Sequence, residues 1–293
     1  MKKVILRSLL FSLATFVSVQ NAVSQEAKVG NSMLWSVVDP KSPADTSYLF
    51  GTIHQISQKD FEITRKIQNA FDKSQVLITE IDLTDTGMVV EMMSRVIMED
   101  GMTLDKLLTK EDYQLLSKFM IENAGLPLAL YNDKKPFMAA MAIMNFFIED
   151  APASYDMVLT QMAQKQGLEI HGLETVAEQM DVLDQTPYKE QADQLIEMIS
   201  NVEETKESYA QIVRAYKAEH LEDLQKLLDE NMGAAGEKSA MLDDRNIKWI
   251  PKIQKVIEEK RCFIAVGAGH LPGEMGLINL LRDEGYEVNP IFG

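Results

Sequence analysis

Short apolar runs bounded by turn residues recur along the chain, and this pattern predicts β-strands. We expect six of them, at residues 35–38, 48–50, 76–81, 169–173, 262–266 and 287–291. Apolar residues that return every three or four positions predict helices at residues 63–71, 104–123, 156–166 and 276–282. This alternation favours an α/β fold, with α+β as the alternative, in which helices flank a central, mostly parallel sheet.

Two segments depart from the simple alternation. Residues 137–147 are rich in methionine, which suits either an adaptable binding groove or a buried helix, and we expect the buried helix. Residues 188–257 are acidic and helical, begin after Pro187 and are interrupted by the glycine-containing stretch 232–236. We expect this second segment to form a helical cap inserted in the C-terminal half of the fold.

The first 24 residues have the layout of a secretory signal peptide, with Lys2 and Lys3 before a short apolar middle and small residues up to Ser24. The apolar run is shorter than the roughly 20 residues that span a bilayer. We therefore expect cleavage near Ser24 and an exported protein, periplasmic or secreted, with one domain over residues 25–293. No membrane attachment is expected after cleavage.

The net charge and the cysteine content exclude some binding partners and an intramolecular disulfide. The net charge is −16, and loss of residues 1–24 removes Lys2, Lys3 and Arg7 but no acid, which leaves −19. Such a surface repels nucleic acid and anionic lipid, so we expect neither as a main partner. The single cysteine, Cys262, cannot form an intramolecular disulfide.

The clearest candidate chemistry lies in two Gly-x-x-His motifs, at residues 51–54 and 267–270. Each follows an apolar strand, and ligands in open α/β sheets bind beyond the carboxyl ends of the strands. Glycine also lets the backbone turn sharply at such a point. We expect the two strands to lie side by side, so that His54 and His270 share one polar site.

A third predicted strand end is acidic. Period-two alternation places Glu80 and Asp82 on one face, where a carboxylate needs a cation, a metal or several donors to offset burial. His54, Glu80 and His270 would form a usual ligand set for a divalent ion such as Zn, Mn or Co, which activates a bound water. A metal-free acid-base site made of histidine and glutamate is the alternative. The residue types leave both readings open.

Several short motifs occur in a fixed order, at residues 49–54, 80–82, 173–175 with Gln179, 245–246 and 266–271. In order and spacing, from about residue 33 to residue 290, the sequence resembles the TraB/GumN family. That family includes the Tiki-type peptidases and is more distantly similar to the erythromycin esterases.

The site residues that the resemblance implies are His54, Glu80, Arg245 and His270, with Asp82 and Glu174 in support. Arg245, carried back toward the sheet by the cap, would hold a carboxylate or stabilise an oxyanion. Similarity to Tiki-type members implies a metal-dependent peptidase with His54, Glu80 and His270 as ligands, whereas similarity to the esterases implies a metal-free hydrolase. The expected substrate is a peptide or a small ester or amide. A non-enzymatic binding protein is the rival, because other members are linked with pheromone shutdown and polysaccharide production.

Overall fold

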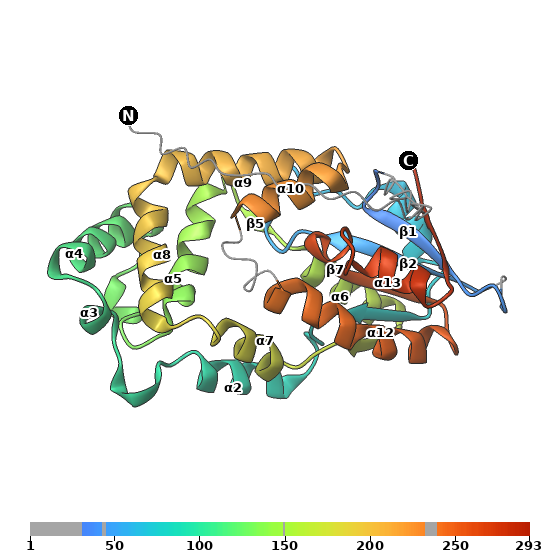
Figure 1. Cartoon of the computed structure of the whole chain (residues 1–293), viewed down its shortest axis with the longest axis horizontal. Coiled ribbons are helices and arrows are strands. Elements are labelled where there is room, and N and C mark those ends of the chain that lie inside the picture. The colour runs from blue at the N-terminus through green and yellow to red at the C-terminus, as the bar shows by residue number, and fades with distance from the viewer. Residues whose placement is uncertain (1–30, 43–44, 149, 232–238) are drawn as a thin grey trace, which may run out of the picture.

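The protein is built around a six-stranded sheet in the order β6-β4-β7-β2-β1-β8 (Figure 1). A computed structural model describes residues 31–42, 45–148, 150–231 and 239–293, so the predicted signal peptide at residues 1–24 lies outside the described residues. The strands of the sheet are β1 (Leu34–Val38), β2 (Thr46–Thr52), β4 (Val76–Thr79), β6 (Glu169–Gly172), β7 (Cys262–Gly267) and β8 (Glu287–Pro290).

The strands β6, β4, β7 and β2 are parallel neighbours, whereas β1 pairs antiparallel with β2 and with β8. The central strands β4 and β7 are apolar and buried along their length, as expected for parallel strands covered on both faces. All four parallel strands point their carboxyl ends to the same edge of the sheet. The polar residues that follow these strands are therefore brought together.

Helices cover both faces of the sheet. Figure 1 shows α12 (Asp244–Ile257) and α13 (Leu277–Asp283) in front of it and α6 (Tyr155–Gln166) behind it. The helix α1 (Arg65–Phe71) packs through Phe71, whose ring centroid lies 5.2 Å from that of Phe263. The strand β3 (Ile56–Ser57) follows His54 in the chain and pairs with β5 (Pro152–Ala153) in a short two-stranded sheet.

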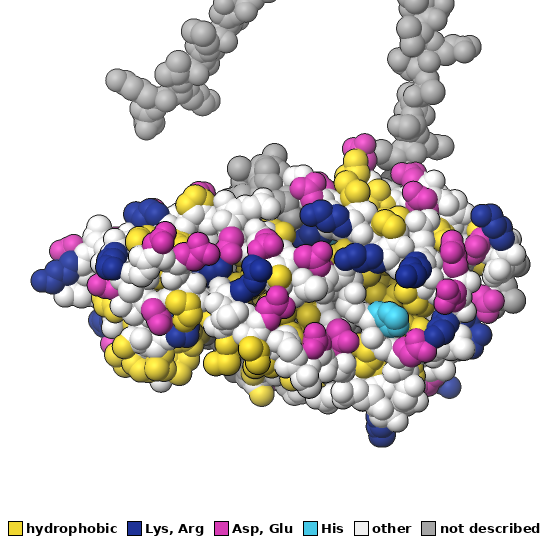
Figure 2. All heavy atoms as spheres, turned by 90° about the horizontal axis from the view of Figure 1, so that it is seen from below, with side chains coloured by type: hydrophobic (Ala, Val, Ile, Leu, Met, Phe, Trp, Pro, Cys, Tyr) yellow, Lys and Arg dark blue, Asp and Glu magenta, His cyan; other side chains and the backbone are white. Residues whose placement is uncertain are grey.

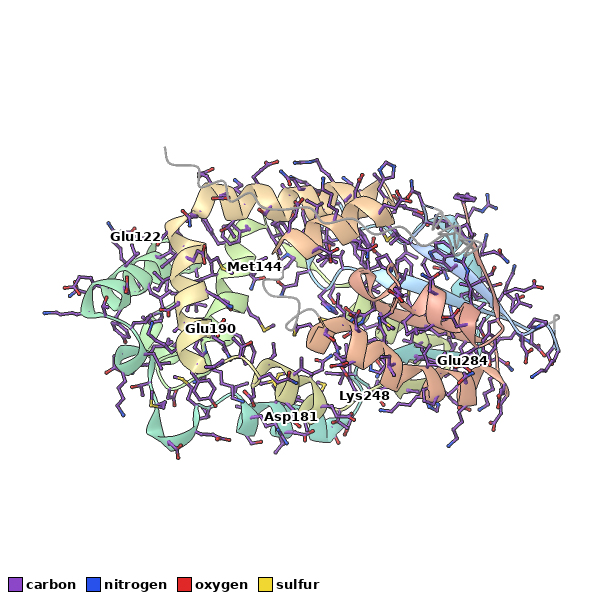
Figure 3. The ribbon with its side chains drawn as sticks, viewed as in Figure 1. Glu122, Met144, Asp181, Glu190, Lys248 and Glu284 are labelled. Carbon is purple, nitrogen blue, oxygen red and sulfur yellow. The ribbon has the colours of Figure 1, made fainter. Side chains whose placement is uncertain are left out.

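A second group of helices, which we call the helical half, lies away from the sheet (Figure 1). Its members are α2 (Thr86–Arg95), α3 (Leu104–Leu107), α4 (Lys110–Phe119), α5 (Pro136–Met144), α7 (Val176–Leu183) and α8 (Tyr188–Ser200). Buried residues such as Leu104, Leu116 and Leu195 form a core of its own. Figure 3 places Glu122 and Glu190 in the helical half, and Lys248 and Glu284 in the sheet half.

Short turns of helix connect these elements. The 3-10 turns are η1 (Glu99–Gly101), η3 (Leu128–Leu130), η4 (Asn145–Phe147) and η6 (Ala268–His270), and the π-helical turns are η2 (Met120–Ala124) and η5 (Ser239–Asp243). The helices α9 (Val202–Lys217) and α10 (Leu221–Asn231) run along the top of the view in Figure 1. Tyr209 of α9 packs against both the sheet core and the helical core, so α9 joins the two halves.

The predicted α/β class and all six predicted strands are confirmed. The single helix predicted over residues 104–123 is wrong, because the chain breaks into α3 and α4. Leu108 adopts an extended backbone and the Thr109 side chain accepts a hydrogen bond from the Asp112 amide at 3.1 Å, which starts a new helix.

The expected buried helix at residues 137–147 is wrong in part. It is a helix, but only one side is buried, through Ala139 and Ile143, while Met141 is 53% exposed and Phe146 37% exposed. The physical reason is that α5 packs against α8 on one side, whereas no described element covers Met141 in the same way.

The segment 188–257, predicted as a cap, contributes to both halves. Its first helix, α8, packs against α3, α4 and α5, whereas α10 and η5 contact η6, the turn that carries His270. The cap boundaries stay a prediction. None of the helices that the structure describes is long and apolar enough to cross a membrane.

Candidate active site

The parallel strands each deliver one side chain to the same place: His54 follows β2, Glu80 follows β4, Glu174 follows β6 and His270 follows β7. The strands β2 and β7 are direct neighbours, with Thr52 opposite Gly267. The prediction that the two Gly-x-x-His strands lie side by side is therefore confirmed. Arg245 reaches the group from the first turn of α12.

The glycines of the two motifs serve close approach. A Cβ atom on Gly51 would lie 3.0 Å from the Ala268 Cα atom, and one on Gly267 would lie 3.2 Å from Glu80 Oε1 and 3.4 Å from His54 Nε2. Neither glycine has a positive φ, so a left-handed turn is not the reason for glycine here. The motif thus lets the two turns touch and leaves room for the charged side chains.

His54 is the accessible member of the site, with 65% of its side chain exposed. Its Nδ1 lies 2.9 Å from Asp156 Oδ2, and the Thr52 hydroxyl donates to the other carboxylate oxygen at 3.3 Å. The hydrogen bond to Asp156, supported by the charge of Glu80, raises the pKa of His54 to about 9, although partial desolvation of the ring nitrogens opposes the shift. His54 is therefore protonated at neutral pH.

Glu80 is buried and fully hydrogen-bonded. Its Oε1 accepts from the Gly267 amide at 2.7 Å, and its Oε2 accepts from Arg245 at 2.6 Å and from Gln179 at 3.1 Å. Burial opposes ionisation, but electrostatic interaction with the His270 and His54 rings and with the Arg245 guanidinium, together with the Gly267 hydrogen bond, lowers the pKa of Glu80 to about 2. The carboxylate is ionised at neutral pH.

Arg245 faces inward and holds two carboxylates. Beyond Glu80, it donates to Glu174 through Nη2 and, at 3.2 Å, through Nε. The Trp249 indole N–H also donates to Glu174, at 3.3 Å, and the Arg245 guanidinium lies 4.8 Å from the Trp249 ring centroid. Arg245 Nη1 donates to the Met241 carbonyl at 2.9 Å. All three guanidinium nitrogens thus meet protein acceptors, and the arginine neutralises the buried acids.

His270 is buried and held in one tautomer. Asn246 donates its amide to the Met275 carbonyl at 2.7 Å, so its oxygen faces His270 Nδ1 at 2.7 Å and requires a proton there. His270 Nε2 then carries a lone pair, which accepts from Arg245 Nη1 at 3.2 Å. Burial, with the charge of Arg245 nearby, lowers the pKa of His270 to about 3 in spite of Glu80, so the ring is neutral.

The centre of the site is Glu80 Oε1, because His54 Nε2 and His270 Nε2 each lie 3.8 Å from it. Two imidazoles whose Nδ1 atoms are held by acceptors and whose Nε2 atoms converge are typical of metal ligands. The side chains as they stand do not fit a metal ion, however. Arg245 is bonded to His270 Nε2 and to Glu80, and no group of three or more His, Cys, Asp or Glu residues within the described ranges could hold one.

Asp82, the other supporting acid, is not brought to the centre. The strand β4 ends at Thr79, so the predicted period-two alternation stops before Asp82. Its Oδ1 instead accepts from the Thr84 amide at 2.8 Å and from the Thr84 hydroxyl at 2.6 Å, which closes a turn. Glu174, by contrast, lies in the centre beside Arg245.

The sequence interpretation missed the partners that orient the two histidines. Asp156 lies in the first turn of α6, behind the helix cap Ser154, about a hundred residues from His54, and no local pattern links the two. Asn246 and Gln179 belong to the quoted motifs but were given no role. In the sequence, only their positions next to Arg245 and close to Glu174 pointed to a role in the site.

Fold and site together define an α/β protein with a charged, partly buried cluster at the carboxyl ends of four parallel strands. The TraB/PrgY/gumN family model matches residues 33–290, and the chain belongs to this family.

Two relatives come from Danio rerio. The chain is 23% identical to the protein named Metalloprotease TIKI2, over 88% of this chain and 60% of that protein. It is also 23% identical to Metalloprotease TIKI1, over 88% of this chain and 63% of that protein. The chain thus spans less than two thirds of the length of these relatives. No solved structure matches it.

Proposed function

We propose that the protein is a peptidase-like hydrolase that cleaves a peptide or a small ester or amide. One observation carries the proposal: His54 and Glu80 face each other at 3.8 Å with pKa values of about 9 and about 2. A protonated imidazole beside an ionised carboxylate supplies the proton donor and the proton acceptor that general acid-base hydrolysis requires. The names of the two relatives support the same class of reaction.

In this proposal Glu80 is the base and His54 the acid. The Glu80 carboxylate accepts a proton from the attacking water, whose oxygen forms the new bond to the carbonyl carbon. Protonated His54 donates its proton to the leaving nitrogen or oxygen as that bond breaks, and the proton on Glu80 then restores His54. Asp156 orients the ring of His54, while Arg245 keeps Glu80 ionised between turnovers.

A metal-dependent peptidase is the second candidate. The converging Nε2 atoms of His54 and His270 favour it, as does the word metalloprotease in the relatives' names. It requires Arg245 Nη1 to leave His270 Nε2, because that nitrogen cannot bind an ion while it accepts a hydrogen bond.

The export of the chain and a peptide, ester or amide substrate belong to the same proposal. Support for export comes from the positive start and short apolar run of residues 1–24.

Cleavage of a peptide library and of small ester and amide substrates, with and without chelator, tests the two candidates. The acid-base pair predicts cleavage that survives chelation, with protein free of stoichiometric metal. The metal candidate predicts loss of cleavage on chelation and recovery when metal is restored. Absence of cleavage under every condition would overturn the hydrolase proposal and leave a binding protein.

A further inference from the structure

A pocket of about 220 Å³ lies between α9 and the segment that follows His54. Its floor is apolar, formed by Phe147, Tyr209 and Val213. Phe147 is 3% exposed and Val213 9% exposed, so both belong to the packed protein and give the pocket a fixed base. We call this feature the α9 pocket.

The rim of the α9 pocket is basic. Lys59, Lys206, Arg214 and Lys217 line it, and Asp60 is the acid among the lining residues. This is unusual in a chain whose net charge is −16. Lys206 and Lys217 lie on the same face of α9 as Tyr209 and Val213, because residues three and four apart stack on one side of a helix. The α9 pocket therefore combines an apolar floor with a positively charged rim.

The basic groups are not equally engaged. Lys217 forms an ion pair with Asp60, and Arg214 forms one with Glu207. Among the residues that the structure describes, Lys206 has no ion-pair partner. Lys206 is exposed at the rim, so its charge is available to a ligand.

The α9 pocket is attached to the candidate active site. Ser57 lines the pocket and follows His54 by three residues, so their Cα atoms are at most about 11 Å apart. The Tyr209 hydroxyl donates to the Gln55 carbonyl at 3.2 Å, and the Tyr216 hydroxyl donates to the Gly51 carbonyl at 3.0 Å. Both ends of the turn that carries His54 are thus fastened to α9. The pocket therefore adjoins the segment of the chain that directly follows His54.

We propose that the α9 pocket is a subsite for an apolar residue of a peptide substrate. This apolar residue is either next to an acidic residue or is itself the C-terminal residue with its free carboxylate. The apolar floor takes the hydrocarbon part, and Lys206 with its basic neighbours pairs with the carboxylate. The carboxylate comes either from an acidic side chain or from the C-terminus of a peptide. This inference rests on the proposed hydrolase function for its biological meaning, but binding tests it without any cleavage.

The test is calorimetric titration of three short peptides into the full chain carrying His54→Ala, which keeps the probes intact. The first has neutral blocked ends and a central Leu-Glu pair, the second has Leu-Gln in its place, and the third ends in leucine with a free carboxylate. Bulk repulsion by the acidic protein predicts weaker binding of both carboxylate peptides. The subsite predicts the opposite, with at least one of them bound about fivefold more tightly than the Leu-Gln peptide at low salt.

Lys206→Glu should abolish this preference, and Lys206→Gln should reduce it. The matched control is Lys118→Glu on α4, the same charge change at an exposed lysine of the helical half, which should leave the preference intact. Comparison of the first and third peptides identifies the source of the carboxylate.

The proposal is overturned if neither carboxylate peptide is preferred. It is also overturned if the preference persists in Lys206→Glu, or if Lys118→Glu removes it equally, which would indicate bulk charge. If the parent protein cleaves nothing while the preference follows Lys206, the hydrolase proposal fails and the subsite stands.

Discussion

The sheet half of the molecule buries a connected cluster of charged side chains, whereas the core of the helical half is apolar. In the sheet half, Glu80, Arg245 and His270 are buried within a protein core. In the helical half the core is apolar and large hydrophobic side chains lie outside it, with Val90 71% exposed and Met93 69% exposed. Figure 2 shows hydrophobic side chains clustered at the helical end of the face seen from below.

The difference indicates where the fold can bury charged side chains. A buried charge is costly unless it is paired and hydrogen-bonded, and the buried charges of Glu80, Glu174 and Arg245 meet such partners. Most of those partners come from the four strand ends and α12, while Gln179 of α7 hydrogen-bonds to Glu80 and Asp156 of α6 hydrogen-bonds to His54. The helical half has no comparable convergence: its ion pairs are isolated, exposed for Arg95 with Asp181 and partly buried for Lys135 with Asp184.

Removal of the buried cation should have the largest effect. Arg245→Met leaves Glu80 and Glu174 without their shared partner, and we expect a loss of about 3–5 kcal/mol in the free energy of unfolding. The matched control is Arg95→Met, which breaks an exposed pair and should cost less than about 1 kcal/mol. Urea unfolding followed by circular dichroism measures both. Equal losses would contradict the contrast between the halves.

A cavity in the helical core should weaken the fold but spare the chemistry. Leu116 is fully buried there, and Leu116→Ala should cost about 3 kcal/mol. Hydrolysis per folded molecule should stay unchanged, because no site residue comes from α4. An activity assay at a temperature where the variant is folded checks this. Loss of activity in that folded variant would show that the two halves are coupled.

The partner of His54 should set the alkaline limit of activity. With the acid-base pair, activity falls as pH rises through about 9, and Asp156→Asn should move this limit toward the ordinary histidine pKa of 6.5. The pKa of His54 is raised by folding, so its contribution to stability is present below pH 6.5 and lost as pH rises through about 9. NMR titration of the ring, beside a pH–rate profile, measures the shift. If Asp156→Asn leaves the alkaline limit of the pH–rate profile unchanged, His54 is not the catalytic acid.

A charge on the exposed face of α2 should have the smallest effect. Val90→Glu replaces a side chain that is 71% exposed, and we expect a change in unfolding free energy within about 0.5 kcal/mol. The same urea titration detects it. A loss of 2 kcal/mol or more would show that Val90 is covered in solution.

The sequence predicted what depends on local pattern. Strand periodicity located all six strands of the main sheet, and the two Gly-x-x-His motifs predicted that His54 and His270 share one site, where both lie beside Glu80. The errors arose where tertiary contacts decide the outcome. A cap at Thr109 divided a continuous helical pattern, and the early end of β4 turned Asp82 away.

The orienting partners were also beyond the reach of local pattern. Asp156 and Asn246 act on histidines far away in the chain, through hydrogen bonds that exist only after the helices have packed.

The central claim is that His54 is the exposed acid of a hydrolytic site, and His54→Ala tests it most directly. Because 65% of the side chain is exposed, the variant should stay folded, and the stability that it loses should be the part contributed by the raised pKa of His54, which is present only below about pH 9. The account predicts that this folded variant loses hydrolysis by about a hundredfold or more, the usual contribution of general acid-base catalysis. A well-folded His54→Ala protein that cleaves substrate at the parent rate would contradict the account.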